Sequence, residues 1–260
     1  MEVPIRSSRV PLLFVLIALA HSAPAQQVAT NSPDAAAILR RAFSTMSSGA
    51  RISSTAIAGS ATRYDGSVGA SGTFAFSADS TEQSRFDFSL PTGTSGEIRT
   101  VTDGAPSGSG IAPGGVVYAV GPQNPMTASA WFFPALTLAP RLAAQYYGKS
   151  YVGKESRNGV AVSHLQVWRQ SNEGTVATAA TVRQLSLEDV YLDWTSHLPV
   201  AITFSLHSIG GVAGDTPVEV DFSDYQMVQG SPVPYHIRVY MAGALFWDIQ
   251  VSSVSITSAS

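Results

Sequence analysis

The chain of 260 residues contains no cysteine and carries a formal net charge of −3, with charged residues making up only 13% of the sequence. The lack of thiols excludes disulfides, thiolate metal sites, cysteine nucleophiles and a lipid-modified N-terminal cysteine. The weak acidic balance argues against nucleic acid or anionic lipid headgroups as electrostatic partners, so apolar, neutral or protein partners are favoured.

The first 25 residues have the order of features found in a secretory signal peptide. Arg6 and Arg9 precede an apolar run from Val10 to Ala20, and Ala23-Pro24-Ala25 forms a small-x-small cleavage site. The apolar run is shorter than the roughly 20 residues that span a bilayer as a helix. We therefore expect residues 1–25 to be a signal peptide cut after Ala25, and a periplasmic or secreted mature chain without a transmembrane segment.

A short linker and one helix are expected before the first strand. Residues 26–33 form a polar linker, and a single domain is expected over residues 34–260. Ser32 is a suitable N-cap and Pro33 suits the first helical position. Apolar residues then recur at helical spacing up to Met46, which predicts an amphipathic helix.

From Arg51 onward the hydrophobic period changes to two, which is typical of strands with one buried face. This alternation places Phe74, Phe76, Phe86 and Phe88 on one face of a sheet. Asp65-Gly66 and Asn158-Gly159 are tight-turn signals of the kind that connect hairpin strands.

The middle of the chain combines a loop with an apolar helical segment. Residues 105–115 are rich in Gly, Pro and Ser, which predicts a mobile loop. The pattern from Thr127 to Tyr147 predicts one or two helices, interrupted at Pro134 and Pro140. This segment carries the apolar side chains of Trp131, Phe132, Phe133, Leu136 and Leu142.

The alternating pattern of the second half of the chain predicts further strands with short connections, which gives about ten strands in all. One of them places Ile202 and Phe204 on its apolar face. Clean alternation and the absence of crossover helices predict an antiparallel sheet. Such a sheet must bury its dry face, either as a curved sheet around the helices, as a closed barrel or as a two-sheet sandwich.

Sequence motifs for chemistry are few. Neither a nucleophile elbow nor a phosphate loop occurs. Glu219 and Asp221 point the same way from one strand and would suit a loose calcium site or a carboxylate pair, but a solvated strand face is far commoner. Glu188, Asp189 and Asp193 are interpreted in the same way.

The histidines that remain after cleavage do not have the spacing of a metal-binding pair; they are His164, His197, His207 and His236. We therefore predict no catalytic residue, no metal and no cofactor.

The large apolar side chains say more about function than the polar motifs do. Such residues usually form an ordinary core, but a large curved sheet with two short helices as filling has more concave apolar surface than those helices cover. Apolar cavities of that kind hold acyl chains. The candidate cavity residues are Phe74, Phe76, Phe86, Phe88, Trp131, Phe132, Phe133, Leu136, Leu142, Ile202 and Phe204.

This layout resembles the LolA/LolB-like fold of periplasmic lipoprotein carriers and related lipid-binding proteins. The resemblance is one of pattern: a signal peptide, an N-terminal helix over 34–47, strands, a central helical segment and an antiparallel meander. The stretches that carry it are Arg85–Pro91, Glu97–Gly104, Val190–Trp194 with Leu198-Pro199, Val220–Tyr225 and Val233–Tyr235. It implies an incomplete antiparallel barrel, or strongly curved sheet, wrapped around the N-terminal helix and the central helical segment. It also implies a cavity arginine, for which Arg63 and Arg85 are both candidates.

The favoured function is a non-enzymatic carrier or binding protein for lipid or lipoprotein acyl chains, with an envelope transport component as a further candidate partner. One alternative is an exported β-sandwich that binds protein or glycan through exposed Tyr225, Tyr240 and Trp247. A second is a hydrolase whose His and carboxylate groups converge from distant strands.

Overall fold

A computed structural model describes residues 32–48, 51–102, 105–121, 124, 127, 132–142, 146–171, 176–208 and 214–258. The predicted signal peptide, the linker up to residue 31 and Trp131 lie outside these residues. Among the described residues, no helix combines the length and apolarity required to cross a membrane.

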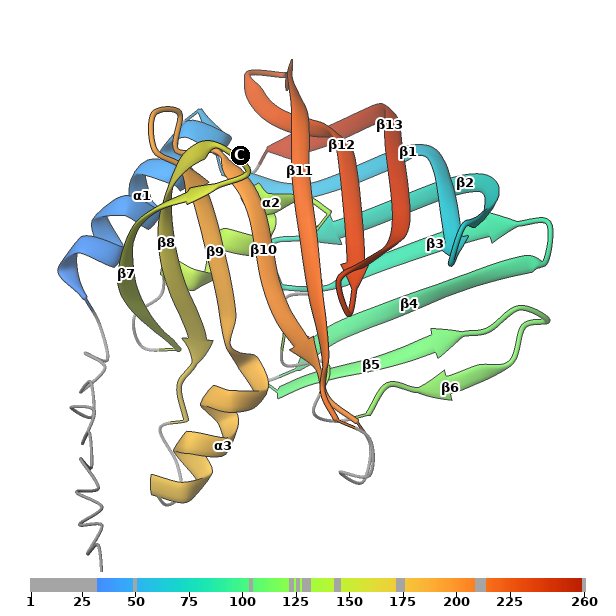
Figure 1. The fold of residues 1–260 in the computed structure, drawn as a ribbon, viewed down its shortest axis with the longest axis horizontal. Coiled ribbons are helices and arrows are strands. Elements are labelled where there is room, and N and C mark those ends of the chain that lie inside the picture. Colours follow the sequence, from blue (N-terminus) through green and yellow to red (C-terminus); the bar gives the residue numbers. More distant parts are fainter. Residues whose placement is uncertain are drawn as a thin grey trace, which may run out of the picture.

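One antiparallel sheet of 13 strands dominates the molecule, more than the ten or so that the sequence predicts (Figure 1). The strands of the first half are β1 (Ile52–Asp65), β2 (Val68–Asp79), β3 (Ser84–Leu90), β4 (Gly93–Thr102), β5 (Ala105–Ile111) and β6 (Val117–Ala119). Those of the second half are β7 (Tyr147–Arg157), β8 (Val160–Arg169), β9 (Glu188–Asp193), β10 (Pro199–Leu206), β11 (Thr216–Val228), β12 (Ser231–Met241) and β13 (Ala244–Ser258).

The spatial order of the strands is two meanders joined at the centre. The order runs from β6 back to β1, continues through β13, and then runs from β12 back to β7. The joint is the long pairing of β1 with β13, from Ile52 opposite Ser258 to Arg63 opposite Trp247. Because β6 and β7 each have one sheet neighbour, the sheet is open and these strands are its edges.

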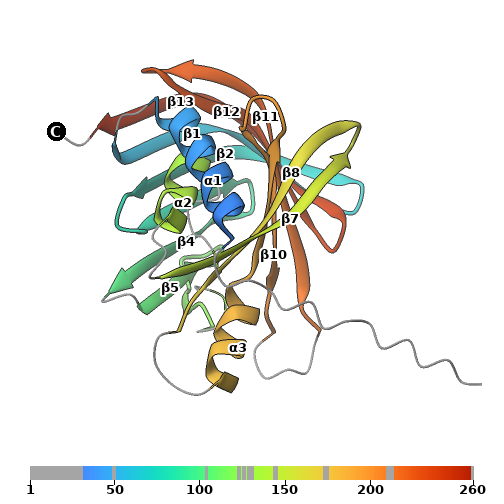
Figure 2. The same cartoon turned by 90° about the vertical axis from the view of Figure 1, so that its left-hand side faces the viewer.

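The sheet curves around two of the helices, as Figure 2 shows. Helix α1 (Pro33–Ser47) packs against β12, β7 and the short helix α2 (Pro134–Leu138) inside the curve. A 3-10 helix η2 (Pro140–Leu142) follows α2, whereas helix α3 (Val176–Ser186) packs against β8. The predicted architecture, a strongly curved antiparallel sheet around an N-terminal and a central helical segment, is confirmed.

Helix α1 begins as its capping residues predict. The Ser32 hydroxyl accepts a hydrogen bond from the Ala35 amide at 3.3 Å, and Pro33 occupies the first turn. One face of α1 is buried, with Ala35, Leu39 and Met46 at most 1% exposed. The amphipathic spacing therefore explains both the start of this helix and the face that it turns to the sheet.

The hairpin signal at Asn158-Gly159 is also confirmed. These residues connect β7 to β8 with φ angles of 50° and 81°. Both angles are positive, as a two-residue turn requires when it follows the twist of antiparallel strands.

The structure departs from the sequence-based expectations at residues 105–115 and at helix α3. Most of the predicted loop over 105–115 is strand β5, which pairs with β4 from Gly96 opposite Ile111 to Thr102 opposite Ala105. Ladder hydrogen bonds to β4 thus override the low strand propensity of Gly, Ser and Pro. The interruptions predicted at Pro134 and Pro140 coincide with the first residues of α2 and η2, where proline needs no amide partner. Helix α3 was not predicted at all.

Candidate functional site

The concave face of the sheet carries an apolar layer. Alternation along β2 and β3 places four phenylalanines on this face, with Phe74 opposite Phe88 and Phe76 opposite Phe86. Phe74, Phe76 and Phe88 are 1–3% exposed, and Phe86 is partly buried. The predicted common face of these four side chains is therefore confirmed.

Phe132, which precedes α2, lies at the centre of this layer. Its ring is 5.2 Å from that of Phe74, 5.5 Å from that of Phe76 and 5.5 Å from that of Phe86, all edge to face. Edge-to-face contacts of this kind add to the stabilisation that burial alone gives. The central helical segment thus covers the phenylalanine face by inserting one aromatic ring into it.

The remaining predicted cavity residues join the same cluster. Phe133, Leu136, Ile202 and Phe204 are 1–6% exposed, and Leu142 is partly buried against them. The structure therefore brings together all ten described candidates from both halves of the sheet.

Two of the three aromatics assigned to an exposed binding surface are not exposed. Trp247 is 8% exposed and stacks on Phe88, with ring centroids 3.7 Å apart. Tyr225 packs against the core, and its hydroxyl donates to the Pro199 carbonyl at 2.7 Å. The alternative of an exported β-sandwich that binds protein or glycan also requires two sheets. The described strands form a single sheet, so that architecture is wrong.

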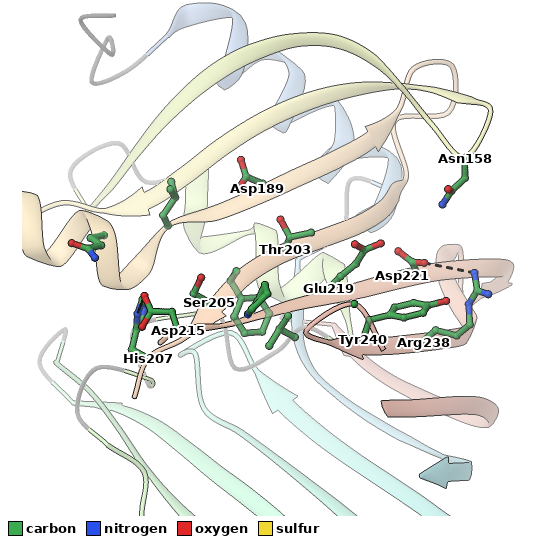
Figure 3. Close-up of a pocket in the computed structure, with 16 residues that line it drawn as sticks. Asn158, Asp189, Thr203, Ser205, His207, Asp215, Glu219, Asp221, Arg238 and Tyr240 are labelled. Carbon is green, nitrogen blue, oxygen red and sulfur yellow. Dashed lines mark ion pairs between the residues drawn. The ribbon is translucent and has the colours of Figure 1, made fainter. Parts of the chain in front are cut away.

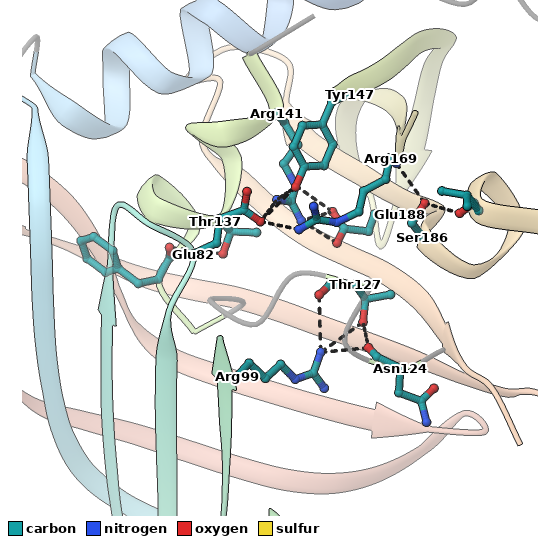
Figure 4. Close-up of polar contacts among 12 residues, drawn as sticks. Glu82, Arg99, Asn124, Thr127, Thr137, Arg141, Tyr147, Arg169, Ser186 and Glu188 are labelled. Carbon is teal, nitrogen blue, oxygen red and sulfur yellow. Dashed lines mark hydrogen bonds and ion pairs between the residues drawn. The ribbon is translucent and has the colours of Figure 1, made fainter. Parts of the chain in front are cut away.

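A buried ionic network lies beside the apolar layer (Figure 4). Arg141 of η2 is 2% exposed and donates to both carboxylate oxygens of Glu188 on β9, at 2.9 and 3.2 Å. It also donates to the Tyr147 hydroxyl of β7 at 3.1 Å. That hydroxyl donates to Glu82, at 3.0 Å, and Arg169 of β8 pairs with the same carboxylate. The network therefore joins the helical segment to the β2–β3 turn on one flank and to strands β7–β9 on the other.

Charge and burial shift the ionisation of this network. Burial disfavours the Arg141 cation, but Glu188, Tyr147 and Glu82 outweigh that cost and raise its pKa. Burial also raises the pKa of the Tyr147 phenol to about 12. Arg141 is thus a cation and Tyr147 a neutral hydrogen-bond donor at every physiological pH.

A second buried arginine lies further along the concave face. Arg99 of β4 is 4% exposed, pairs with Glu97 and donates to the carbonyls of Asn124 and Thr127 at 3.1 and 3.4 Å. It therefore ties residues between β6 and α2 to the sheet.

The two arginines proposed from the sequence do not lie in the apolar layer. Arg63 is exposed beside the Phe246 ring, and Arg85 has a side chain 49% exposed that pairs with Asp87. Arg141 and Arg99 were missed because a buried arginine within a helical or strand pattern has no local sequence signal. The interpretation of Glu188 as part of a solvated face is also wrong, since it is 1% exposed.

The carboxylates and histidines outside the apolar layer form local pairs. His164 bonds to Glu155 and Asp189, each at 2.7 Å, and these bonds raise its pKa against the opposing effect of burial. Asp193 accepts from the Thr195 and Ser196 amides in the turn after β9, at 3.0 and 2.7 Å. In the part of the chain that the structure describes, no group of three or more His, Asp or Glu is arranged to hold a metal ion.

Asp221 gives a prediction for the pH dependence of stability. Burial, reinforced by Glu219, raises the pKa of Asp221 from 3.8 to about 6, with Arg157 and Arg238 acting in the opposite direction. The folded chain therefore keeps a proton that the unfolded chain releases near pH 4. The contribution of Asp221 to the free energy of unfolding is therefore greatest below about pH 4 and is lost as the pH rises through about 6.

We expect the melting temperature of Asp221→Asn to depend less on pH between 4 and 6 than that of the unmodified protein, because the amide does not titrate. Thermal unfolding monitored by circular dichroism over this range measures the difference. Asp224→Asn is the matched control, since the Asp224 side chain is 69% exposed. Identical pH profiles for the unmodified protein and Asp221→Asn would contradict the assignment.

Comparison with known proteins identifies the fold. No protein-family model matches the chain, and no curated protein matches its sequence. A domain from Vibrio parahaemolyticus, provisionally described as an outer membrane lipoprotein-sorting protein domain, aligns with a TM-score of 0.54 and 10% identity over 86% of this chain and 92% of that one. A LolA superfamily protein from Nitrosomonas europaea aligns with a TM-score of 0.52 and 12% identity over 87% and 94%.

A DUF1329 family protein from Desulfovibrio piger is similar to the same extent, with a TM-score of 0.53 and 13% identity over 85% of this chain and 92% of its own. All three alignments extend over nearly the full length of the compared structures. The fold is therefore LolA-like, as the sequence pattern suggests.

Proposed function

We propose that this protein is a non-enzymatic carrier, periplasmic or secreted, that binds the acyl chains of lipids or lipoproteins against its concave apolar layer. The observation that carries the proposal is how that layer is covered. Helix α1 and one short helical segment, with Phe132 as its anchor, fill a space enclosed by strands from both halves of the sheet. The LolA-like fold supports the same function.

Burial alone is sufficient to bind an acyl chain. Each buried methylene contributes about 0.8 kcal/mol, so one long chain supplies gross stabilisation on the order of 10 kcal/mol. The loss of translational and rotational freedom offsets much of this gain. Binding would then be reversible, as transfer between envelope components requires.

Loading would require the helical segment to move, because Phe132 occupies the centre of the layer. The contacts that restrain this movement are both apolar and polar. Phe132, Phe133 and Leu136 are buried in the core. Arg141 bonds to Glu188 and Tyr147, and Arg99 to residues 124 and 127. When the segment moves outward, its polar contacts can be exchanged for water, and a bound acyl chain would replace its apolar contacts. Lid motions of this kind occur on microsecond to millisecond timescales.

The test uses a fluorescent fatty acid, 11-(dansylamino)undecanoic acid, whose emission increases in an apolar site. We expect the unmodified protein to bind it and long-chain phospholipid to displace it. Phe132→Asp should weaken binding strongly, because the carboxylate would be desolvated without a partner. Val68→Asp is the control, since Val68 is 71% exposed on the rim of β2.

Folding is measured in parallel by thermal unfolding. Lost binding in Phe132→Asp with an intact melting transition supports the carrier. Absence of probe binding by the unmodified protein, together with collapse of Phe132→Asp, means that these aromatics are ordinary core and the carrier proposal fails.

A further inference from the structure

A second concave surface lies on the outer face of the sheet, opposite the apolar layer. It is a groove of about 1010 Å³ over strands β9 to β12 (Figure 3). This volume is at the upper end of the roughly 300–1,000 Å³ found for small-molecule sites. The lining is rich in polar side chains, among them Asn158, Asp189, Thr203, Ser205, Glu219 and Tyr240.

Strand register aligns the polar side chains of the groove. Asp189 lies opposite Thr203, Thr203 opposite Glu219, and Glu219 opposite Tyr240. Side chains directly opposite on neighbouring strands share a face, with Cβ atoms about 5 Å apart. The four residues therefore form one continuous polar row across four strands, which Figure 3 shows from the side of the groove.

The four lining carboxylates are each paired with a base. Asp189 bonds to His164 at 2.7 Å and Asp215 to His207 at 3.0 Å. Glu219 pairs with Arg157, and Asp221 with Arg238 at 3.6 Å. Arg157 and Arg238 offset the charges of Glu219 and Asp221, and all four pairs restrict the movement of the carboxylate side chains.

Charge compensation determines which ligand the groove suits. A polycation or an anion gains most from unpaired charges of opposite sign, and here each lining carboxylate already has a partner. A neutral ligand with many hydroxyls gains instead, because paired carboxylates and arginines keep lone pairs and N–H groups that form charge-assisted hydrogen bonds. The Tyr240 ring adds an amphipathic surface for the C–H faces of such a ligand.

We infer that this outer groove binds a neutral saccharide chain, with the row from Asp189 to Tyr240 as its hydrogen-bonding floor. The site is separate from the proposed acyl site, because strand alternation directs the two sets of side chains to opposite faces of the sheet. On β10, for example, Ile202 belongs to the apolar layer whereas Thr203 and Ser205 line the groove. Phe204 and Val218 belong to the apolar layer and also border the groove.

The experiment titrates the full chain with maltohexaose, cellohexaose and chitohexaose. Isothermal titration calorimetry measures the affinity, and amide chemical shifts locate the binding site. Spermine and inorganic phosphate serve as charged probes. Tyr240→Ala removes the aromatic surface, and Thr203→Trp fills the floor of the row. Tyr118→Ala is the matched control, since Tyr118 is 49% exposed on the edge strand β6.

We expect at least one hexasaccharide to bind with shifts centred on β9 to β12, and both groove variants to weaken that affinity by about tenfold or more. Tyr118→Ala should bind as the unmodified protein does. Circular dichroism confirms folding of each variant, and either groove variant is sufficient for the test if the other fails to fold. Binding of no hexasaccharide, preferential binding of spermine or phosphate, or saccharide affinity unchanged in a folded groove variant would each overturn the inference.

Discussion

Replacing Arg141 with Met is expected to lower the free energy of unfolding by about 3–5 kcal/mol. The substitution removes the guanidinium that pairs with the Glu188 carboxylate, whose side chain is 2% exposed. A carboxylate buried in this way must either remain charged in an apolar environment or take up a proton, and both cost stability. Urea unfolding followed by tryptophan fluorescence gives the difference directly.

Two further variants separate the burial of charge from the loss of packing. Arg85→Met removes an arginine whose side chain is 49% exposed, so it should cost less than about 1 kcal/mol. Arg141→Met combined with Glu188→Leu removes both charges and should recover much of the loss. A cost for Arg141→Met no greater than that for Arg85→Met would show that Arg141 is solvated in solution.

Phe132→Ala is expected to cost about 3–5 kcal/mol of stability while increasing the capacity of the apolar layer for ligand. The ring of Phe132 contacts four other phenylalanines, and its removal leaves a cavity that they line. An apolar cavity of this kind stays dry and accepts an apolar guest. A saturating fatty acid should therefore raise the melting temperature of Phe132→Ala more than that of the unmodified protein.

Leu39→Ala on α1 is the control for this effect. Leu39 is fully buried in the same core, so its truncation should cost stability by the same mechanism. The fatty acid should stabilise Leu39→Ala no more than the unmodified protein, because Leu39 lies on α1 rather than at the centre of the phenylalanine face. Equal ligand stabilisation in both variants would argue against Phe132 marking the acyl site.

Local signals were sufficient to predict the elements whose structure depends on neighbouring residues. The Ser32-Pro33 cap, the Asn158-Gly159 turn and the alternating phenylalanines of β2 and β3 all encode their geometry within a few positions. Strand β5 could not be predicted in this way, because its residues form a strand through pairing with β4. Helix α3 buries little more than Ser186, so it has no apolar stripe from which it could be recognised.

In the candidate site, too, features set by local sequence could be predicted, and features set by contacts between distant residues could not. The apolar residues of the concave layer followed from the period of two, which shows which side chains share a face. The ionic network did not, because Arg141 and Glu188 are 47 positions apart and meet only when η2 packs across the ends of the strands. Pairing of the groove carboxylates with His164 and Arg157 likewise depends on the register of strands distant in sequence.

The central pairing of β1 with β13 has a consequence for how the chain folds. Each meander consists of strands that follow one another in sequence, so each can assemble from local hairpins. The pairing of β1 with β13 joins residues such as Ile57 and Val254, which are nearly 200 positions apart. Contacts between residues so distant in sequence are expected to form late. Until then β1 and β13 are two long edges that remain open to pairing with other chains. We therefore expect a stage of folding in which association with another copy competes with pairing of β1 with β13. Dilution, or a chaperone that shields these edges, should favour the native fold.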